Sequence, residues 1–271
     1  TKDPKEIRAT YVRTSLGTYA GEFTAPGTKN TFTTSVDTTG PVGNSKHLFY
    51  RLVVDAGSTP SSRPGFDHSV SVYPSLTYRW SPDTYLTVKG ESSKDTRQQD
   101  DGVIPIFTNG TAFGENATYY TAPLKTIYQD STDRGLDYGR ALAAFFQTRL
   151  GEWTLHIQSR SVWHVDQVRE WSVNNANVFN PKATFATPTT TLRRQYNNVR
   201  NGHRYNYADA NAFRRFGPEK FRNTVLLGVG GGGEAFLNQR IAFGPNAPAS
   251  QAITLIHPTL NLASAYPADG T

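Results

Sequence analysis

Residues 67–80 alternate strictly between apolar and polar side chains, and this period of two constrains the fold more than any other feature of the sequence. The pattern is typical of a β-strand with one apolar and one polar face. The strand is longer than the roughly five or six residues usual in globular proteins. It is long enough to cross a bilayer, for which about 9–11 residues of a tilted barrel strand suffice. The apolar positions are Val70, Val72, Pro74, Leu76, Tyr78 and Trp80.

The same alternation recurs along the chain and predicts about nine strands. A composition rich in Thr, Ser, Tyr, Phe and Gly agrees, because the β-branched and aromatic residues among these favour strands. The pattern is weaker over residues 142–147, which also fit a short helix. The expected strands are about 7–18, 30–39, 48–55, 67–80, 86–91, 142–147, 153–160, 203–216 and 223–230.

Short and long connections alternate between these strands. Residues 40–44, 81–84, 150–152 and 217–220 have the Gly, Pro, Asn and Asp composition of tight turns. The longest intervening links are about 98–136 and 167–200. Tight turns at one end and long loops at the other are typical of an outer-membrane barrel, whereas long structureless loops are uncommon in compact soluble domains. The sequence therefore predicts an all-β, antiparallel, up-and-down transmembrane β-barrel.

The sequence offers no motif for catalysis or metal binding. It has no Cys, and its six His residues show no ligand spacing. Gly228–Gly233 matches a dinucleotide-binding pattern, but neither a following helix nor an acidic residue supports it, so a flexible strand end running into a loop is expected. Asp130 and Asp133 lie in a predicted loop and are expected to be solvated. We expect no enzyme activity, no catalytic residue, no cofactor and no bound metal.

The first long loop carries aromatic side chains together with cations, which suit an anionic or aromatic metal chelate. Packing of the loops against one another is an equally good explanation of these rings. The net charge of +6 is scattered along the chain, so a nucleic-acid partner is not expected. The candidate ligand-binding residues are Phe107, Phe113, Tyr119, Tyr120 and Arg134.

An ordered series of segments resembles the barrel region of TonB-dependent outer-membrane receptors, most closely the siderophore-receptor type. The series runs in register through about residue 230. Its segments are Thr14–Tyr19, Val36–Val42, Leu48–Leu52, Tyr73–Thr84, Asp101–Pro105 and Asn223–Val229.

The resemblance implies energised uptake of a ferric siderophore or similar chelate across the outer membrane of a Gram-negative bacterium. The family fold is a barrel of about 22 strands around an N-terminal plug. Residues 1–271 would form part of that barrel, with the plug and its contact to the TonB energy-coupling complex absent. The lack of Met agrees with Thr1 being a processed or cut end. The resemblance places Arg51, Asp55, Arg79, Lys89 and Glu91 toward the lumen or the plug.

Two other interpretations also fit the sequence. The chain would also fit a soluble or surface-attached β-rich module that binds carbohydrate or acts in adhesion. Within the barrel class, it would fit a receptor for a non-iron substrate, because the loops set the ligand and the Pro-rich stretch 58–64 departs from the family pattern.

Overall fold

A computed structural model gives the fold of this chain. It describes residues 2–18, 30–60, 65–100, 105–107, 119–121, 127–173, 191–192, 194–218, 221–243 and 253–254.

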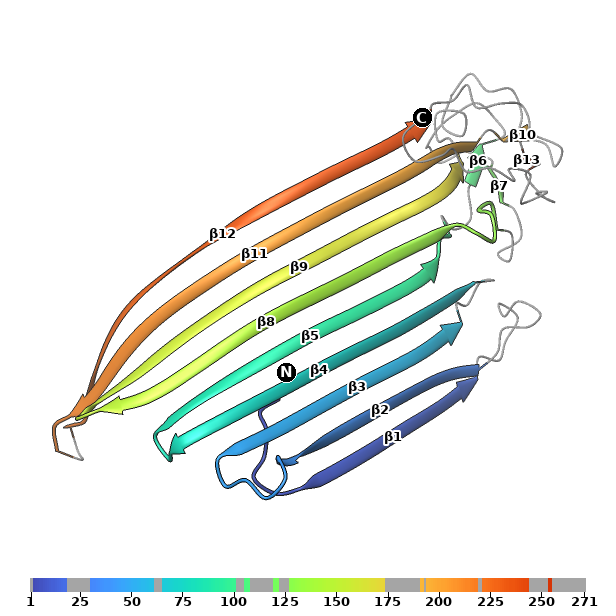
Figure 1. Ribbon diagram of the computed structural model, residues 1–271. Coiled ribbons are helices and arrows are strands. Elements are labelled where there is room, and N and C mark those ends of the chain that lie inside the picture. The colour runs from blue at the N-terminus through green and yellow to red at the C-terminus, as the bar shows by residue number, and fades with distance from the viewer. Residues whose placement is uncertain are drawn as a thin grey trace.

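Nine antiparallel strands form one continuous sheet in the order β1-β2-β3-β4-β5-β8-β9-β11-β12 (Figure 1). Each strand pairs with the strands before and after it, so the predicted up-and-down, all-β architecture is confirmed. The sheet strands are β1 (Ala9–Thr18), β2 (Asn30–Pro41), β3 (Leu48–Pro60), β4 (Phe66–Ser81), β5 (Thr84–Gln98), β8 (Arg134–Leu150), β9 (Trp153–Val173), β11 (Arg194–Phe216) and β12 (Asn223–Phe243). Two short ladders, β6 (Pro105–Phe107) with β7 (Tyr119–Thr121) and β10 (Thr191–Leu192) with β13 (Ile253–Thr254), lie outside it.

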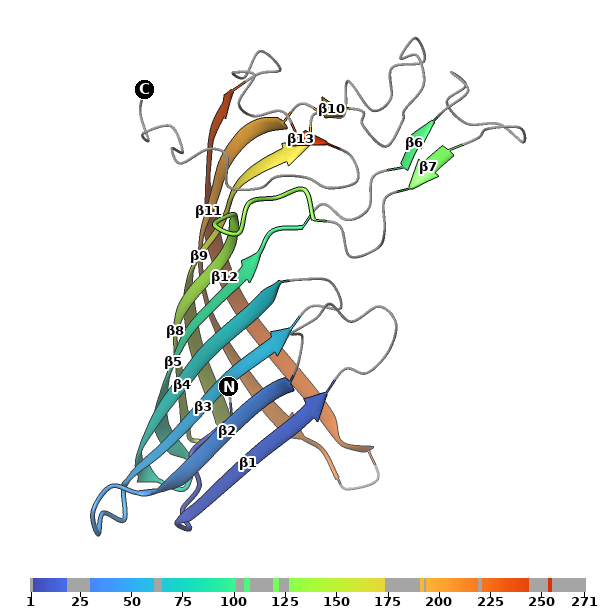
Figure 2. The same ribbon diagram turned by 90° about the vertical axis from the view of Figure 1, so that its right-hand side faces the viewer.

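The sheet is strongly curved and has the shape of a barrel wall (Figure 2). Tight turns join the strands at one end, and at two of them Gly43 and Gly151 have φ values of 59° and 61°. This left-handed backbone conformation suits glycine because it has no Cβ. We call this the turn end and the opposite end the loop end. Within the described residues, no helix is long and apolar enough to cross a membrane.

Several strands extend well into segments predicted to be loops. β9 runs to Val173 and β11 begins at Arg194, so both ends of the predicted loop 167–200 are strand. Residues 142–147 lie in β8, which decides against the short helix. The prediction for Gly228–Gly233 was wrong, because these residues lie in the middle of β12 rather than at a frayed strand end.

Contacts with the neighbouring strand around Tyr207 explain two of these glycines, Gly230 and Gly232. Tyr207 of β11 is directly opposite Gly232, and its hydroxyl lies close to Gly230. A Cβ on Gly230 would lie 3.0 Å from that hydroxyl oxygen, and one on Gly232 would lie 2.4 Å from the carbonyl oxygen of Asn206. The sheet therefore needs glycine at these two positions, because a side chain would collide with the neighbouring strand.

The two faces of the wall differ in chemistry. The convex face of the turn half is apolar and carries Leu76, Tyr78 and Trp80, which are exposed in the isolated wall. Tyr78 and Trp80 pack with ring centroids 4.7 Å apart in an edge-to-face arrangement. The aromatic residues near the turns do not all lie on this face: Phe49 points to the concave side and is 6% exposed beneath Arg79.

Candidate functional site

The concave face of the wall collects the acidic side chains of the sheet. Residues that pair across antiparallel strands share a face, so the register assigns each strand residue to one side. Every Asp and Glu of the nine described sheet strands falls on the concave side. They are Asp37, Asp55, Asp67, Glu91, Asp95, Asp137, Asp166, Glu170, Asp209 and Glu234. A polar interior surface of this kind is typical of outer-membrane barrels.

All five residues predicted to face the lumen or the plug lie on this concave face. They are Arg51, Asp55, Arg79, Lys89 and Glu91. Their contact with a lumen or a plug stays a prediction. Sequence reasoning missed Asp37, which holds Arg51 through hydrogen bonds of 2.8 and 2.6 Å from Nε and Nη2. The turn between β2 and β3 was the available signal, because it brings the two residues onto one face.

The N-terminal residues 2–8 lie across the concave face of β2–β5, held by charged groups. Asp3 accepts from Lys89 at 2.7 Å, and its carbonyl oxygen accepts from Arg51 at 3.0 Å. Glu6 pairs with Arg79. The backbone N–H of Lys5 donates to the Thr39 hydroxyl at 2.8 Å. Three of the five predicted residues thus bind a segment of the chain's own N-terminus.

Further toward the loop end, histidines and carboxylates pair across the concave face. His164 Nε2 lies 2.9 Å from Asp137, and His203 Nδ1 lies 3.1 Å from Glu234. The two imidazole ring centroids are 6.5 Å apart. Together with the Arg160–Glu91 pair at 3.0 Å, these contacts give the loop half a surface on which acidic side chains pair with histidine and arginine. Such a surface can hold polar and charged groups.

A buried polar cluster lies where the first long loop meets the sheet. The prediction that Asp130 and Asp133 are solvated was wrong, because their residues are 1% and 0% exposed. Asp130 accepts from Arg194 of β11 at 2.7 Å, and the side chain of Arg194 is fully buried. Asp133 Oδ2 accepts from the backbone N–H of Trp171 at 3.1 Å. These contacts hold residues 127–133 against the loop ends of β9 and β11.

The predicted ligand-binding residues fall at the loop end. Phe113 lies outside the described residues. Phe107 and Tyr119 occupy paired positions of the β6–β7 hairpin, and Tyr120 pairs with Ile106. Arg134 begins β8 on the convex side, where its guanidinium lies 4.7 Å from the ring centroid of Phe66. The structure brings Phe107, Tyr119 and Tyr120 together in one hairpin and places Arg134 where the strand begins.

No group of three or more His, Asp or Glu side chains in the described ranges is arranged to hold a metal ion.

Solved structures of outer-membrane receptors match this chain along its whole length. The ferripyoverdine receptor of Pseudomonas aeruginosa matches with a TM-score of 0.75 and 13% identity over 100% of this chain and 33% of the receptor. The chain has the fold of a siderophore-receptor barrel wall. The ferric-catecholate import receptor Fiu of E. coli K12 matches at TM-score 0.70, with 14% identity over 96% of this chain and 38% of Fiu. The siderophore receptor PiuA of Acinetobacter baumannii has the same TM-score, with 12% identity over 96% of this chain and 37% of PiuA.

These matches confirm the predicted architecture, part of a larger β-barrel. The chain spans about a third of the length of the receptors that it matches. The proteins that share its fold are outer-membrane receptors, in agreement with the predicted location. The matched structures are transport receptors, not enzymes. No family model and no curated protein matches the sequence.

Proposed function

We propose that this chain is part of the barrel wall of a TonB-dependent outer-membrane receptor that takes up a ferric siderophore or similar metal chelate. The observation that carries the proposal is the wall itself, with all of its strand carboxylates on the concave face and apolar side chains on the convex face. A water-filled or plugged interior surrounded by lipid requires this distribution. Siderophore receptors share the fold.

In this proposal, the loop end and the concave face of the wall have different roles. The loop end, with the aromatic hairpin β6–β7, would contact the chelate. The concave face would contact the plug, whose movement is driven by the energy-coupling complex. The wall performs no chemistry on its cargo, so we propose that the protein is not an enzyme. The ion-paired positions Arg51, Arg79 and Lys89 would then lie at the boundary between barrel and plug.

The apolar convex face argues against the soluble carbohydrate-binding alternative. A soluble wall would have to cover Val70, Leu76 and Trp80, which are 50%, 45% and 52% exposed. An exposed apolar band would cause a water-soluble protein to aggregate, whereas lipid covers it in a barrel. Extraction from membranes only with detergent supports the barrel. A protein that is monodisperse in plain buffer would contradict it.

Uptake by a Gram-negative host without its own siderophore receptors tests the transport function. Cells expressing the protein would receive ferripyoverdine or a ferric catecholate labelled with radioactive iron. We expect accumulation of one chelate, and we expect its loss when the proton gradient is collapsed or the coupling protein is deleted. Folded receptor in the outer membrane that binds neither these nor any other ferric chelate would exclude the iron function and favour a non-iron substrate.

The aromatic hairpin offers a sharper test of the binding site. Phe107→Ala and Tyr119→Ala should each weaken chelate binding about tenfold, the loss expected when one stacking aromatic contact of about 1–2 kcal/mol is removed. Tyr205→Ala is the matched control, because Tyr205 lies in β11 on the concave face. Equal affinity for all variants would exclude the hairpin from the binding site.

A further inference from the structure

A short segment before β1 covers cations of the concave face near the turn end. It comprises residues 2–8, and we call it the strap. The cations beneath the strap are shielded from water, with 8% of the Arg51 side chain and 14% of the Lys89 side chain exposed. The acidic side chains of the strap are 74% exposed at Asp3 and 63% exposed at Glu6. The strap thus lies on the surface of the concave face, above a set of shielded donors.

Polar contacts rather than apolar packing hold the strap. Its one large aliphatic side chain, Ile7, is 78% exposed. Asp3 and Glu6 attach it to the wall through ion pairs and a hydrogen bond. Because water reaches the carboxylates of both ion pairs, these pairs contribute little to stability. The strap can therefore leave the concave face at a small cost in free energy.

Three side chains beneath the strap form one row across the sheet. Ser75 of β4 lies directly opposite Arg51 of β3 and directly opposite Lys89 of β5. We call these three residues the concave row. Residues directly opposite each other in antiparallel strands have Cβ atoms about 4.5–5.5 Å apart, so one small anion can reach all three side chains.

The middle of the concave row is a buried hydroxyl group. Ser75 is 5% exposed, and its hydroxyl oxygen is buried without a hydrogen-bond partner in the part of the chain that the structure describes. Buried hydroxyl groups are normally hydrogen-bonded. Here the hydroxyl is a donor between two cations, and this arrangement suits an anion.

Asp3 of the strap shows how an acidic residue meets the concave row. Its carboxylate oxygen lies 2.7 Å from Lys89 Nζ, and its backbone carbonyl oxygen accepts from Arg51 Nη1 at 3.0 Å. The two cations therefore converge on one residue. Lys89 is also fixed from the side, because its Nζ lies 5.0 Å from the ring centroid of Phe145.

We propose that the concave row is a carboxylate-binding subsite, which Asp3 fills until the carboxylate of a ligand inside the barrel displaces it. Lys89 and Ser75 would donate to the carboxylate oxygens, and Arg51 Nη1 would add a further hydrogen bond once the Asp3 carbonyl leaves. Asp37 continues to neutralise Arg51 through the other guanidinium nitrogens, so the charge of Lys89 suits one carboxylate. The subsite rests on the proposed function in placing the concave face inside a barrel, and it assigns a carboxylate to the cargo.

Binding of succinate to the purified protein measures the subsite directly. The protein carrying this chain is purified in detergent, and calorimetry gives its affinity for succinate and for the uncharged dimethyl ester. The strap variant D3N/E6Q removes both competing carboxylates and leaves every cation in place. We expect it to bind succinate about tenfold more tightly than the unaltered protein, the gain expected if the strap fills the subsite about nine-tenths of the time. Neither protein should bind the ester.

Substitutions added to the strap variant identify the donors. Lys89→Gln and Ser75→Ala should each weaken succinate binding about tenfold, because each removes a hydrogen bond to a charged group. Unchanged affinity in both variants, equal binding of the ester, or no succinate binding by the strap variant would overturn the proposal.

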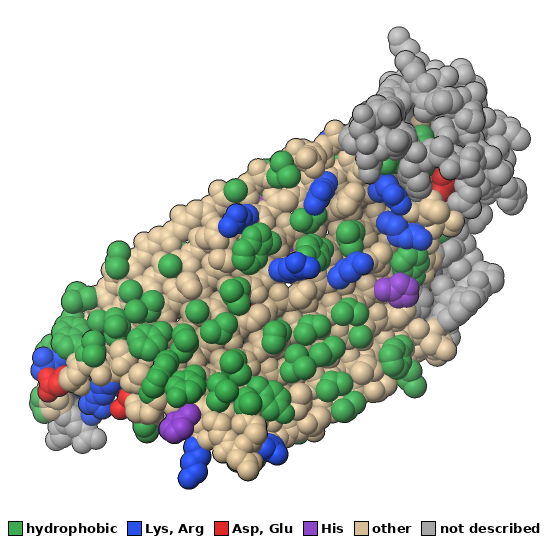
Figure 3. Space-filling view, viewed as in Figure 1, with side chains coloured by type: hydrophobic (Ala, Val, Ile, Leu, Met, Phe, Trp, Pro, Cys, Tyr) green, Lys and Arg blue, Asp and Glu red, His purple; other side chains and the backbone are tan. Residues whose placement is uncertain are grey.

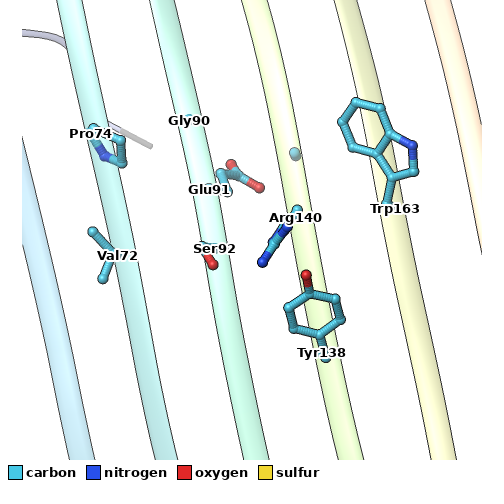
Figure 4. A pocket seen from close by; sticks show the side chains of 9 residues that line it. Val72, Pro74, Gly90, Glu91, Ser92, Tyr138, Arg140 and Trp163 are labelled. Atoms are coloured by element: carbon cyan, nitrogen blue, oxygen red, sulfur yellow. The ribbon is translucent and has the colours of Figure 1, made fainter.

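A cation of the opposite face supplies the matched control. Figure 3 shows Lys and Arg side chains gathered on the loop half of the convex face. Arg140 is an exposed cation of that face and lines a hollow together with Tyr138 and Trp163 (Figure 4). Arg140→Gln in the strap variant should leave succinate affinity unchanged. A loss as large as that of Lys89→Gln would show that succinate binds surface cations in general and would contradict the subsite.

Displacement of the strap has a signal of its own. The chain contains no cysteine, so Ile7→Cys gives it a single attachment point for a nitroxide label, at an exposed side chain. We expect succinate to increase the mobility of this label, as measured by electron paramagnetic resonance. Succinate that binds without changing the mobility of the label would contradict the displacement of Asp3.

Folding and transport are read separately from succinate binding. Slower gel migration after heating reports a folded barrel for each variant. Uptake of ferric chelate tests the proposed function by itself, so a receptor that transports iron but whose strap variant binds no succinate contradicts only the subsite. A folded protein that binds succinate at the concave row but transports no chelate supports the subsite and contradicts the iron function.

Discussion

Arg51 and Asp37 form two parallel hydrogen bonds across β2 and β3, at 2.8 and 2.6 Å, on the concave face. The Arg51 side chain is 8% exposed and that of Asp37 is 13% exposed, so this pair is largely shielded from water. The third guanidinium nitrogen of Arg51 donates to the carbonyl oxygen of Asp3. One arginine therefore joins two strands of the wall to the N-terminal segment.

Removal of Asp37 should destabilise the wall because it leaves Arg51 buried without a counter-charge. We expect Asp37→Ala to lower the free energy of unfolding by about 3 kcal/mol, the lower end of the range for breaking a buried pair. Urea unfolding of the protein in detergent micelles measures this. Asp55→Ala is the control, on the next strand and the same face, and it should cost much less because no ion pair to Asp55 is seen among the described residues. Equal losses for both variants would contradict the special role of the Asp37–Arg51 pair.

Asp130→Asn should unfold the loop-end cluster locally. Arg194 is fully buried beside Asp130, so a neutral residue at position 130 removes a counter-charge from a buried arginine. We expect faster hydrogen exchange at residues 127–133 and a loss of about 3–5 kcal/mol in stability. Replacement of both residues, Asp130→Leu with Arg194→Met, should recover most of this loss. A double variant as unstable as Asp130→Asn would show that the pair itself is not the cause.

Two neighbouring glycines of β12 should respond in opposite directions to alanine. A Cβ on Gly232 would lie 2.4 Å from the Asn206 carbonyl oxygen, whereas one on Gly231 would meet nothing within 4 Å. Gly232→Ala should therefore cost about 1–3 kcal/mol through overpacking. Gly231→Ala should stabilise the protein by up to about 1 kcal/mol, because it restricts the unfolded chain. Urea midpoints of the two variants check both signs, and a destabilised Gly231→Ala would count against this explanation.

Lipid contact of the convex face is measurable by fluorescence quenching. Trp80 is 52% exposed on the turn half, whereas Trp171 is 4% exposed in the loop-end cluster. In single-tryptophan variants reconstituted into bilayers with brominated acyl chains, Trp80 should be quenched several-fold more than Trp171. This difference follows because bromine quenches only rings that it approaches closely. Equal quenching of both rings would contradict the placement of the convex face in lipid.

The sequence predicted which segments form strands better than it predicted where those strands end. Alternation of side chains predicted nine strands, each of which overlaps a strand of the sheet, because a period of two follows from strand geometry alone. The family resemblance pointed Arg51, Arg79 and Lys89 inward, and these residues lie on the concave face. The ends of β9, β11 and β12 were not predicted, since polar residues such as Gln167 and Asn198 continue the ladders where the apolar pattern has stopped.

Contacts between residues far apart in the sequence explain the other predictions that were wrong. Asp130 and Arg194 are 64 residues apart, and no local pattern reveals that a loop carboxylate will be buried against a strand. The run of glycines in β12 resembles a flexible loop, and the need for glycine at Gly230 and Gly232 is seen only when β11 with Tyr207 is paired beside them.

The confinement of carboxylates to one face also has a consequence for how the wall is assembled. Sliding a strand by one residue exchanges its two faces. A misaligned strand of the sheet other than β1, which has no acidic residue, would therefore present a carboxylate to the membrane, where an ionised group is costly. This effect on register matters most for β12, because its glycines have no side chains to pack against the neighbouring strand. The single acidic residue of β12 is Glu234. The carboxylates therefore favour the correct strand register, since only the correctly aligned wall can enter the bilayer without placing an acidic side chain in lipid.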